Sequence, residues 1–286
     1  MEMLGVNVLG FVLFSTLMLL LQHICDADNN VSASWECSEA DNSTSENSFQ
    51  ANLNSLLNQL AGNGPARSSF YKTTAGKKSD KIYGLVQCRG DVSAENCANC
   101  TKQSISAALQ DCPKSKNVKV WFTWCFLRYS DQPFFGVWDQ SSTAVFNDTN
   151  FDDPSVGSQG FNFINGVAAA AANQPLMFEA GVLDVGRSGR RYGMAQCTRD
   201  ISGADCRKCL DTQLMTFRTT VGNKRGWEIY GSSCSMWYHD YQFYFNMSTS
   251  SNHGTRRSSS QGIAIEITMI VLVFVLVVWP LDAVQL

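Results

Sequence analysis

Histidine and net charge are both scarce in this chain. Only 3 of its 286 residues are histidine, and charged residues make up 16% of the chain, with a formal net charge of −3. A charge so close to zero provides neither a basic field for nucleic acid nor an acidic tail, so we expect no nucleic-acid partner. The few histidines also disfavour His-based catalysis and His-rich metal sites.

Cysteine, by contrast, is abundant, with 11 residues. This excess of cysteine over histidine favours a disulfide framework in an oxidising compartment. The length indicates one large domain or two of ordinary size. Hydrophobic residues make up 44% of the chain and are concentrated at its two ends.

The amino-terminal end predicts a secretory signal peptide over residues 1–27. Residues 4–21 are almost uninterrupted apolar sequence, and Cys25 and Ala27 place small residues at the cleavage positions. The residues before this stretch contain Glu2 and no Lys or Arg, which departs from the usual basic start of a signal peptide. An uncleaved membrane anchor is therefore the alternative. Cleavage after Ala27 would remove Cys25 and leave an even number of cysteines, which can all pair.

The carboxyl-terminal segment 263–286 predicts a membrane anchor, preceded by a polar tether at 249–262. Its clean apolar stretch, Ile267–Trp279, has 13 residues, whereas a membrane span needs about 20 residues. A polar spacer followed by a short apolar tail is typical of a GPI signal, and a true transmembrane helix is the alternative. Either reading places the middle of the chain outside the cell, tethered at the plasma membrane or secreted.

Glycosylation sequons agree with this location. Each consists of Asn, any residue except Pro, and Ser or Thr, which is the acceptor pattern for N-glycosylation. The expected sites are Asn30, Asn42, Asn147 and Asn246.

An internal repeat organises the middle of the chain. Tyr83–Cys100 and Tyr192–Cys209 are identical at eight of eighteen positions, at an offset of 109 residues that also carries Cys125 onto Cys234. A period this long indicates two tandem domains rather than a solenoid, whose periods are about 20–50 residues. The expected domains are 28–140 and 155–248, with a Ser-, Asn- and Asp-rich linker at 141–154.

The expected helices occupy matching places in the two copies. Apolar residues recur with helical periodicity from Phe49 to Leu60 and, more loosely, from Phe161 to Ala172. Ser-x-x-Asn at Ser93 and Ser-x-x-Asp at Ser202 resemble helix caps, so a second helix carrying Cys-x-x-Cys should begin at each.

The expected strands are rich in aromatic and β-branched residues, as an antiparallel sheet requires. They make the fold class α+β, in two tandem disulfide-rich copies. The strand segments are Ile82–Cys88, Val118–Tyr129 and Phe134–Trp138 in the first copy, and Arg191–Cys197, Trp227–Tyr238 and Gln242–Phe245 in the second.

These motifs resemble a known family. Tyr-Gly-x-x-Gln followed by Cys-x8-Cys-x2-Cys and a later cysteine in an aromatic strand is similar to the plant cysteine-rich repeat domain, also called stress-antifungal or ginkbilobin-2-homologous. The resemblance covers about residues 30–248 and implies, for each copy, a five-stranded antiparallel sheet packed by two helices. The order of segments looks like that of cysteine-rich repeat secretory proteins and plasmodesmata-located proteins.

The resemblance also implies a disulfide pairing. No cysteine lies at Val221, the position equivalent to Cys112, or near the start of the second copy, so one bridge is missing there as a complete pair. We therefore expect the second domain to be the less stable one, because each bridge contributes about 2–4 kcal/mol. The implied bridges are Cys37–Cys112, Cys88–Cys97, Cys100–Cys125, Cys197–Cys206 and Cys209–Cys234.

A mannose site is known in an antifungal member of this family, formed by Asn, Arg and Glu. In the first copy the positions of this Asn, Arg and Glu are occupied by Ser38, Lys119 and Ser130. In the second copy the positions of the Arg and the Glu are occupied by Glu228 and His239. None matches, so the resemblance predicts no mannose site in either copy. Lys119 and Ser130 are kept as candidates for a different polar site.

Enzymatic activity is not expected. A zinc site at Cys-x-x-Cys is the rival of the disulfides, and the secretory location and complete pairing argue against it. His239 lies among Trp237, Tyr238 and Tyr241 in the sequence, where a half-buried strand histidine is the simpler interpretation. We therefore expect no catalytic residue, metal or cofactor.

The chain is therefore predicted to be a non-enzymatic, membrane-tethered extracellular binding, adhesion or signalling module, with plasmodesmata as one location. Its expected partners are the membrane, a protein or a second copy, and a cell-wall glycan. The alternative is a secreted carbohydrate-binding antifungal protein. The late aromatic residues should serve mainly in the core, and some could lie exposed as a partner surface.

Overall fold

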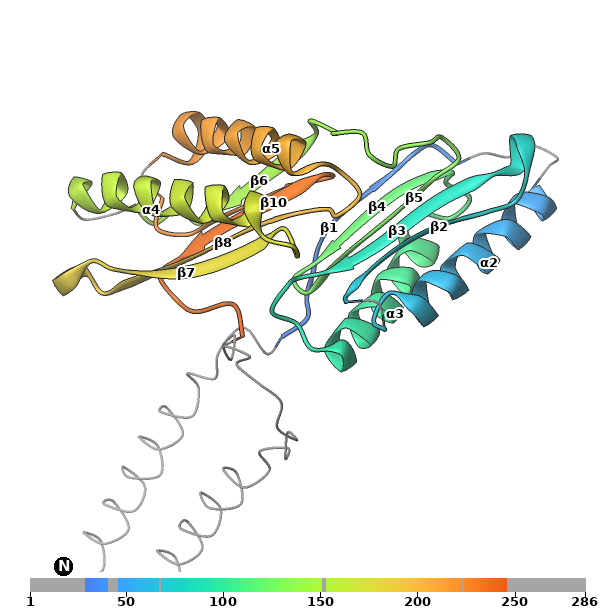
Figure 1. Cartoon of the computed structure of the whole chain (residues 1–286), viewed down its shortest axis with the longest axis horizontal. Helices are drawn as coiled ribbons and strands as arrows, with labels where there is room; N and C mark the ends of the chain where they lie inside the picture. The colour runs from blue at the N-terminus through green and yellow to red at the C-terminus, as the bar shows by residue number, and fades with distance from the viewer. Residues whose placement is uncertain (1–28, 41–45, 67, 151–152, 223, 246–286) are drawn as a thin grey trace, which may run out of the picture. The chain divides into compact units, whose positions relative to one another are not determined.

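The computed structural model describes residues 29–40, 46–66, 68–150, 153–222 and 224–245 (Figure 1). The expected signal peptide, polar tether and carboxyl-terminal anchor lie outside these residues, as do the sequons at Asn42 and Asn246. Within the described ranges, no helix is both long and apolar enough to cross a membrane.

The first repeat alternates strands and helices. Its elements are β1 (Ser32–Cys37), α2 (Glu46–Asn63), β2 (Phe70–Ala75), the short 3-10 helix η2 (Lys78–Asp80), β3 (Ile82–Cys88), α3 (Ala94–Asp111), β4 (Asn117–Phe122) and β5 (Cys125–Ser130).

The second repeat has the same order. Its elements are β6 (Ser142–Phe146), α4 (Pro154–Asn173), β7 (Phe178–Asp184), the 3-10 helix η3 (Gly186–Ser188), β8 (Arg190–Cys197), α5 (Gly203–Thr216), the π-helical turn η4 (Phe217–Val221), β9 (Trp227–Gly231) and β10 (Cys234–His239).

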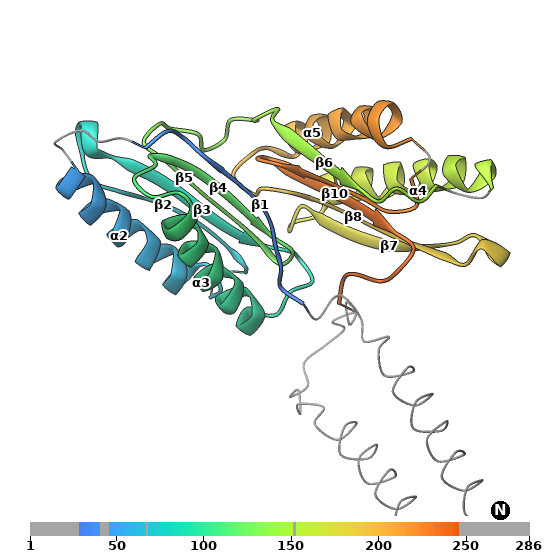
Figure 2. The same cartoon turned by 180° about the vertical axis from the view of Figure 1, so that it is seen from behind.

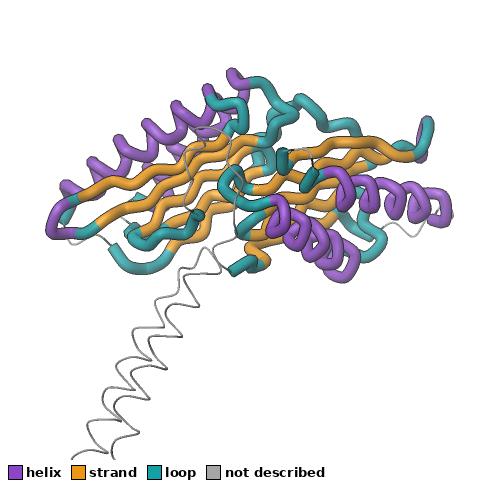
Figure 3. The backbone as a smooth tube through the Cα atoms, turned by 60° about the horizontal axis from the view of Figure 1, so that its bottom comes forward, coloured by secondary structure: helices purple, strands orange, loops and turns teal. Residues whose placement is uncertain are grey.

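Each repeat forms one five-stranded antiparallel sheet, and the two strand orders match: β1-β4-β5-β3-β2 and β6-β9-β10-β8-β7. In both repeats the two helices form a layer on one face of the sheet (Figures 1 and 3). Seen from behind, β1 forms one edge of the first sheet and β6 one edge of the second (Figure 2). Two antiparallel sheets with four helices confirm the predicted α+β class.

The helix layers and sheets enclose two separate cores. In the first, Leu56 and Leu60 of α2 pack on Ile82, Val120 and Leu127 of the sheet, all fully buried. A second cluster of the same kind joins α4 and α5 to β8, β9 and β10. The apolar side chains with helical period therefore face the sheet, as the sequence pattern predicts.

Serine caps begin the cysteine-bearing helices. The Ser93 hydroxyl accepts a hydrogen bond from the backbone N–H of Asn96 at 3.1 Å, and Ser202 accepts one from that of Asp205 at 3.1 Å. Each satisfies an N–H group that the helix itself leaves unpaired. The two predicted helix starts are confirmed.

The late strands differ from the prediction. Val118–Tyr129 is not one strand but most of the hairpin β4–β5, and Trp227–Tyr238 likewise spans β9–β10. The expected partner segments Phe134–Trp138 and Gln242–Phe245 are not strands. The turn at Thr123 contains no Gly, Asn or Pro, so nothing in the sequence interrupts the aromatic pattern there.

The expected linker 141–154 was also wrong in part. Ser142–Phe146 is the edge strand β6, paired with β9 in the second sheet, and Asp153 caps α4. The second repeat therefore begins within this segment. Strand β6 is short and mostly exposed, so it lacks the alternating apolar pattern that marks a strand.

The described residues form five disulfides, the same pairs that the family resemblance implies. They are Cys37–Cys112, Cys88–Cys97, Cys100–Cys125, Cys197–Cys206 and Cys209–Cys234.

The position of the missing bridge is filled by apolar residues. Phe146 pairs with Trp227 as Cys37 pairs with Val118, so the ladder places Phe146 where the first repeat has Cys37. Val221, the counterpart of Cys112, is buried. Beside it, aromatic rings stack in a continuous series of Phe161, Phe217, Trp227 and Tyr238.

This equivalence predicts that the missing bridge can be restored. In a Phe146→Cys/Val221→Cys variant the two cysteines are separated by 75 residues, as are Cys37 and Cys112. We expect a disulfide that raises the free energy of unfolding by about 2–4 kcal/mol, because it constrains a long loop of the unfolded chain. Denaturant unfolding with and without reductant measures the effect.

The matched control is Phe146→Ser/Val221→Ser, which makes similar changes of size without a link. Two free thiols in the folded double-cysteine variant would contradict the positional equivalence.

Candidate functional site

The faces of the sheets that carry no helices bring the two repeats together. The described residues of both repeats belong to one compact unit. Within it, Trp121 of the first repeat joins a cluster whose other buried members belong to the second. These are Phe178, Met194, Tyr230, Trp237, Phe243 and Tyr244.

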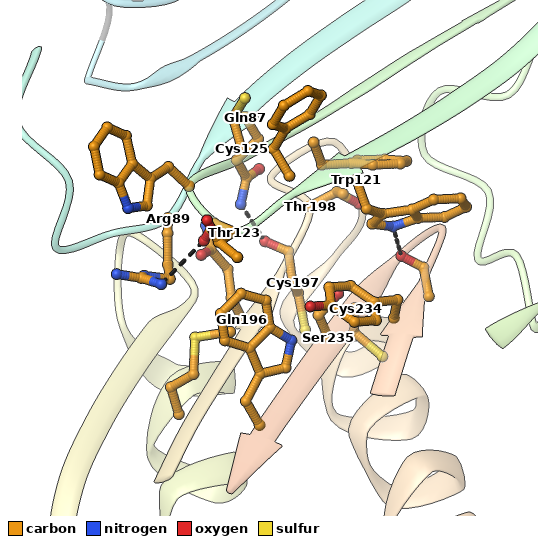
Figure 4. Close-up of a pocket in the computed structure, with 17 residues that line it drawn as sticks. Gln87, Arg89, Trp121, Thr123, Cys125, Gln196, Cys197, Thr198, Cys234 and Ser235 are labelled. Atoms are coloured by element: carbon orange, nitrogen blue, oxygen red, sulfur yellow. Dashed lines mark hydrogen bonds between the residues drawn. The ribbon is translucent and has the colours of Figure 1, made fainter. Parts of the chain in front are cut away.

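Two glutamines make reciprocal hydrogen bonds across this interface. The Gln87 side-chain amide donates to the carbonyl oxygen of Cys197 at 2.7 Å (Figure 4), and Gln196 donates to that of Cys88 at 3.0 Å. Gln87 also accepts a bond from the backbone N–H of Arg199 at 2.9 Å. Because Gln87 and Gln196 are equivalent in the repeat, the contact is isologous, as in a two-fold dimer.

Further contacts follow the same internal symmetry. Gly90 lies against Phe178, where a Cβ would be 2.4 Å from the ring, so only glycine fits there. Its counterpart Arg199 places its guanidinium 5.0 Å from the ring centre of Phe70, the counterpart of Phe178. Trp121 adds a bond from its indole N–H to the carbonyl of Gly231 at 3.1 Å (Figure 4).

Two hollows lie along this interface. One encloses about 50 Å³ around Gln87 and Trp121, too little for an organic ligand. The other has about 200 Å³ and is lined by Arg89 and Trp124 of the first repeat and Glu228 and Trp237 of the second, among others. Arg89 already bonds Asp91 at 2.6 and 2.9 Å and the Thr123 carbonyl at 3.0 Å.

The candidate Lys119 is held by internal partners. Its ammonium lies 3.0 Å from Glu36, 3.3 Å from Asp139 and 3.1 Å from the Ser141 hydroxyl. Burial opposes ionisation of Asp139, but bonds from Ser141 and the charges of Lys119 and Arg128 outweigh it and lower the Asp139 pKa to about 2. Lys119 thus has three oxygen partners within the chain.

The other candidate residues of the first repeat are not brought to Lys119. Ser130 is buried at the end of β5, where its hydroxyl accepts a bond from the Gln132 N–H at 3.0 Å. Ser38 accepts from the backbone N–H groups of Lys116 and Asn117 at 3.1 and 3.2 Å.

In the second repeat the equivalent positions form a pair. Glu228 lies 2.9 Å from His239 Nε2 and also accepts a bond from the Tyr230 hydroxyl. Burial opposes ionisation of Glu228 and would raise its pKa. The hydrogen bond and charge of His239 outweigh this effect, together with the hydrogen bond from Tyr230 and the charge of Arg89, so the Glu228 pKa is lowered. The Tyr230 pKa is raised, first by burial and then by the Glu228 charge.

The sequons and late aromatic residues fall in different environments. The Asn147 side chain is exposed, whereas the amide of Asn30 donates to Gln103 and its oxygen accepts from the Trp124 N–H at 3.3 Å. Tyr241 is 40% exposed, and Phe135 and Trp138 are partly exposed. The other late aromatic residues that the sequence singled out are buried: Trp121, Trp124, Phe134, Trp227, Trp237, Tyr238 and Tyr244. Among the described residues no cluster of His, Cys, Asp and Glu could hold a metal.

Sequence reasoning missed the paired glutamines, although the signal was present. Gln87 and Gln196 are among the positions identical in the two copies, directly before the first repeat cysteine. Identity at a position outside the cysteine framework pointed to a contact made twice, once by each copy.

These features define a class: a disulfide-bonded tandem-repeat protein whose two α+β repeats pack through their open sheet faces. The salt stress response/antifungal family model matches residues 36–132 and 149–241, and the chain belongs to this family.

Named relatives come from two plants. An antimicrobial ginkbilobin-2-like protein of Castanea crenata is 34% identical over 72% of this chain and 86% of its own length. Cysteine-rich repeat secretory protein 38 of Arabidopsis thaliana is 31% identical over 77% of this chain and 88% of its own length. The resemblance inferred from the repeat motifs is thereby confirmed.

Solved structures agree on the fold. The tandem DUF26 ectodomain of the Arabidopsis thaliana cysteine-rich receptor-like protein PDLP8 has a TM-score of 0.65 at 23% identity, covering 74% of this chain and 99% of that one. The tandem DUF26 ectodomain of PDLP5 has a TM-score of 0.62 at 25% identity, covering 73% of this chain and 99% of that one.

The interface predicts a cost for removing either glutamine. Gln87→Leu leaves the Cys197 carbonyl and the Arg199 N–H without these partners, and Gln196→Leu does the same to the Cys88 carbonyl. We expect each variant to lose about 1–3 kcal/mol of unfolding free energy, because buried polar groups remain unpaired. Denaturant unfolding gives the values.

Gln110→Leu on the exposed side of α3 is the matched control and should be nearly neutral. Equal stability of Gln87→Leu and Gln110→Leu would show that the reciprocal contact contributes nothing.

Proposed function

We propose that this chain is a non-enzymatic, membrane-tethered extracellular module of the plant cell surface that binds or adheres to a partner. Its relatives include a secretory repeat protein and receptor-like ectodomains, which supports an extracellular role in signalling or defence. Plasmodesmata are the proposed location within the membrane. The proposed partner classes are a protein, a second copy of this chain and a cell-wall glycan.

The observation that carries the proposal is the internal pairing at the positions of the family's mannose site. Lys119 is held by Glu36, Asp139 and Ser141, and Glu228 is held by His239 and Tyr230. A sugar hydroxyl would have to displace charge-assisted contacts to reach either residue, and replacing them costs more than replacing neutral hydrogen bonds.

The second candidate function is a secreted carbohydrate-binding antifungal protein. It is favoured by the similarity to the antimicrobial ginkbilobin-2-like protein of Castanea crenata. Binding of mannose separates the two candidates.

We expect the full chain to show no mannose binding in calorimetry, because its polar groups at these positions already have partners. Lys119→Ala is the diagnostic variant, and Lys102→Ala on the exposed face of α3 is its control. Micromolar mannose binding that Lys119→Ala abolishes and Lys102→Ala leaves intact would favour the antifungal function instead.

Membrane tethering by a GPI anchor has its own test. We expect phosphatidylinositol-specific phospholipase C to release the protein from plant membranes, because the clean apolar run of 13 residues is short for a span and a cleaved signal need not cross the bilayer. A tag inserted in the exposed turn at Gly186, between β7 and β8, leaves both ends intact and also reports the subcellular location.

The same tagged protein with mock treatment is the control. Retention in the pellet after the phospholipase, together with a second tag kept after Leu286, would establish the transmembrane alternative.

A further inference from the structure

A basic surface lies along β2, the turn that follows it and the start of β3 in the first sheet. It consists of four lysines at the β2–β3 end and two aromatic rings beside them, and is called the basic patch below. Its members are Lys72, Lys77, Lys78, Lys81, Tyr83 and Phe135.

Lysine and aromatic side chains alternate in this patch. The Lys81 ammonium lies 5.0 Å from the ring centre of Tyr83, and that of Lys72 lies 5.3 Å from the ring centre of Phe135. The two rings meet edge to face at 5.6 Å. Both rings are partly exposed, so they offer a surface as well as a packing contact.

The positive charge of the patch is not neutralised by neighbouring carboxylates. None of the ion pairs between described residues involves Lys72, Lys77, Lys78 or Lys81. Lys72, Lys77 and Lys78 are exposed, and Asp80 is the one acidic residue within the turn 76–81.

The second repeat shows that the fold does not require Lys72. Lys72 pairs with Leu85, and Ala180 pairs with Met194, the counterpart of Leu85, so Ala180 occupies the equivalent place. Ala180 is partly buried against the aromatic cluster of the interface. The same framework thus has an apolar residue in one copy and an exposed cation in the other.

We propose that the basic patch binds a linear polyuronide, an anionic polysaccharide with a carboxylate on each sugar ring. Its repeated carboxylates can engage several lysines at once, which adds up individually weak exposed ion pairs. The apolar C–H face of a pyranose ring can lie against Tyr83 and Phe135. The lysines can leave the rings readily, because an exposed cation–π contact is weak.

The aromatic rings favour this partner over an acidic peptide or a lipid surface. A polyanion recognised by charge alone would not need two partly exposed rings between the lysines. The proposal specifies a partner for the extracellular module proposed above and rests on its location, but it places the ligand on a different surface from the mannose positions.

The test is binding of oligogalacturonate to the purified full chain by calorimetry at several salt concentrations. We expect binding that weakens as salt rises. Lys72→Gln/Lys77→Gln/Lys78→Gln/Lys81→Gln should lower the affinity about tenfold or more, because several exposed ion pairs are lost together. Phe135→Leu should lower the affinity for oligogalacturonate without changing the salt dependence.

The matched control is Lys102→Gln/Lys208→Gln, which removes exposed charges on the helices and should change the affinity less than about twofold. Unchanged thermal unfolding shows that each variant is folded.

Absence of binding by the wild-type chain at low salt would overturn the proposal. So would equal binding of polyaspartate of the same length with no effect of Phe135→Leu, or tighter binding of phosphatidylserine vesicles through the same lysines. None of these results bears on release by the phospholipase, so this proposal and that of an extracellular tethered module fail separately.

Discussion

The pairing of two open sheet faces through Gln87 and Gln196 is the contact on which the arrangement of the repeats depends. Helices cover one face of each sheet, so the apolar residues of the other face need a second partner. Trp121 and Trp237 find it in the opposite repeat. The glutamines then satisfy the Cys88 and Cys197 carbonyls at the centre of this contact, where burial would otherwise leave them unpaired.

One framework carries different surface chemistry in the two copies. The position of Lys119 in the first repeat is that of Glu228 in the second. Lys119 pairs with Glu36, and Glu228 contacts His239, each within its own repeat. Because these charges are satisfied locally, the interface does not depend on an ion pair between the repeats at these positions. Away from the interface, the first repeat carries exposed lysines on β2 and in the turn that follows it.

The sequence predicted what depends on strong local signals. The serine caps, the β3 and β8 strands and the two cysteine-bearing helices were correct, since capping and alternation act within a few residues. The hairpin at Thr123 and the edge strand β6 were missed, because the first has no turn residue and the second owes its conformation to pairing with β9. Lys119 was a candidate for a polar ligand site. Its partners Glu36 and Asp139 come from distant segments that only the folded sheet brings together.

The ends of the described chain relate tethering to the basic patch. The Asn29 carbonyl accepts a bond from Thr123, and the Phe245 N–H donates to Asp91, so both ends meet the first repeat beside the β4–β5 turn. Cys88 of β3 pairs with Cys125 at that turn, whereas the patch begins at the other end of β3. Seven residues of extended strand separate them by about 20 Å. A chain anchored through its carboxyl terminus would therefore hold the patch at the end of the first sheet opposite its attachment, where a polymer of the cell wall can reach it.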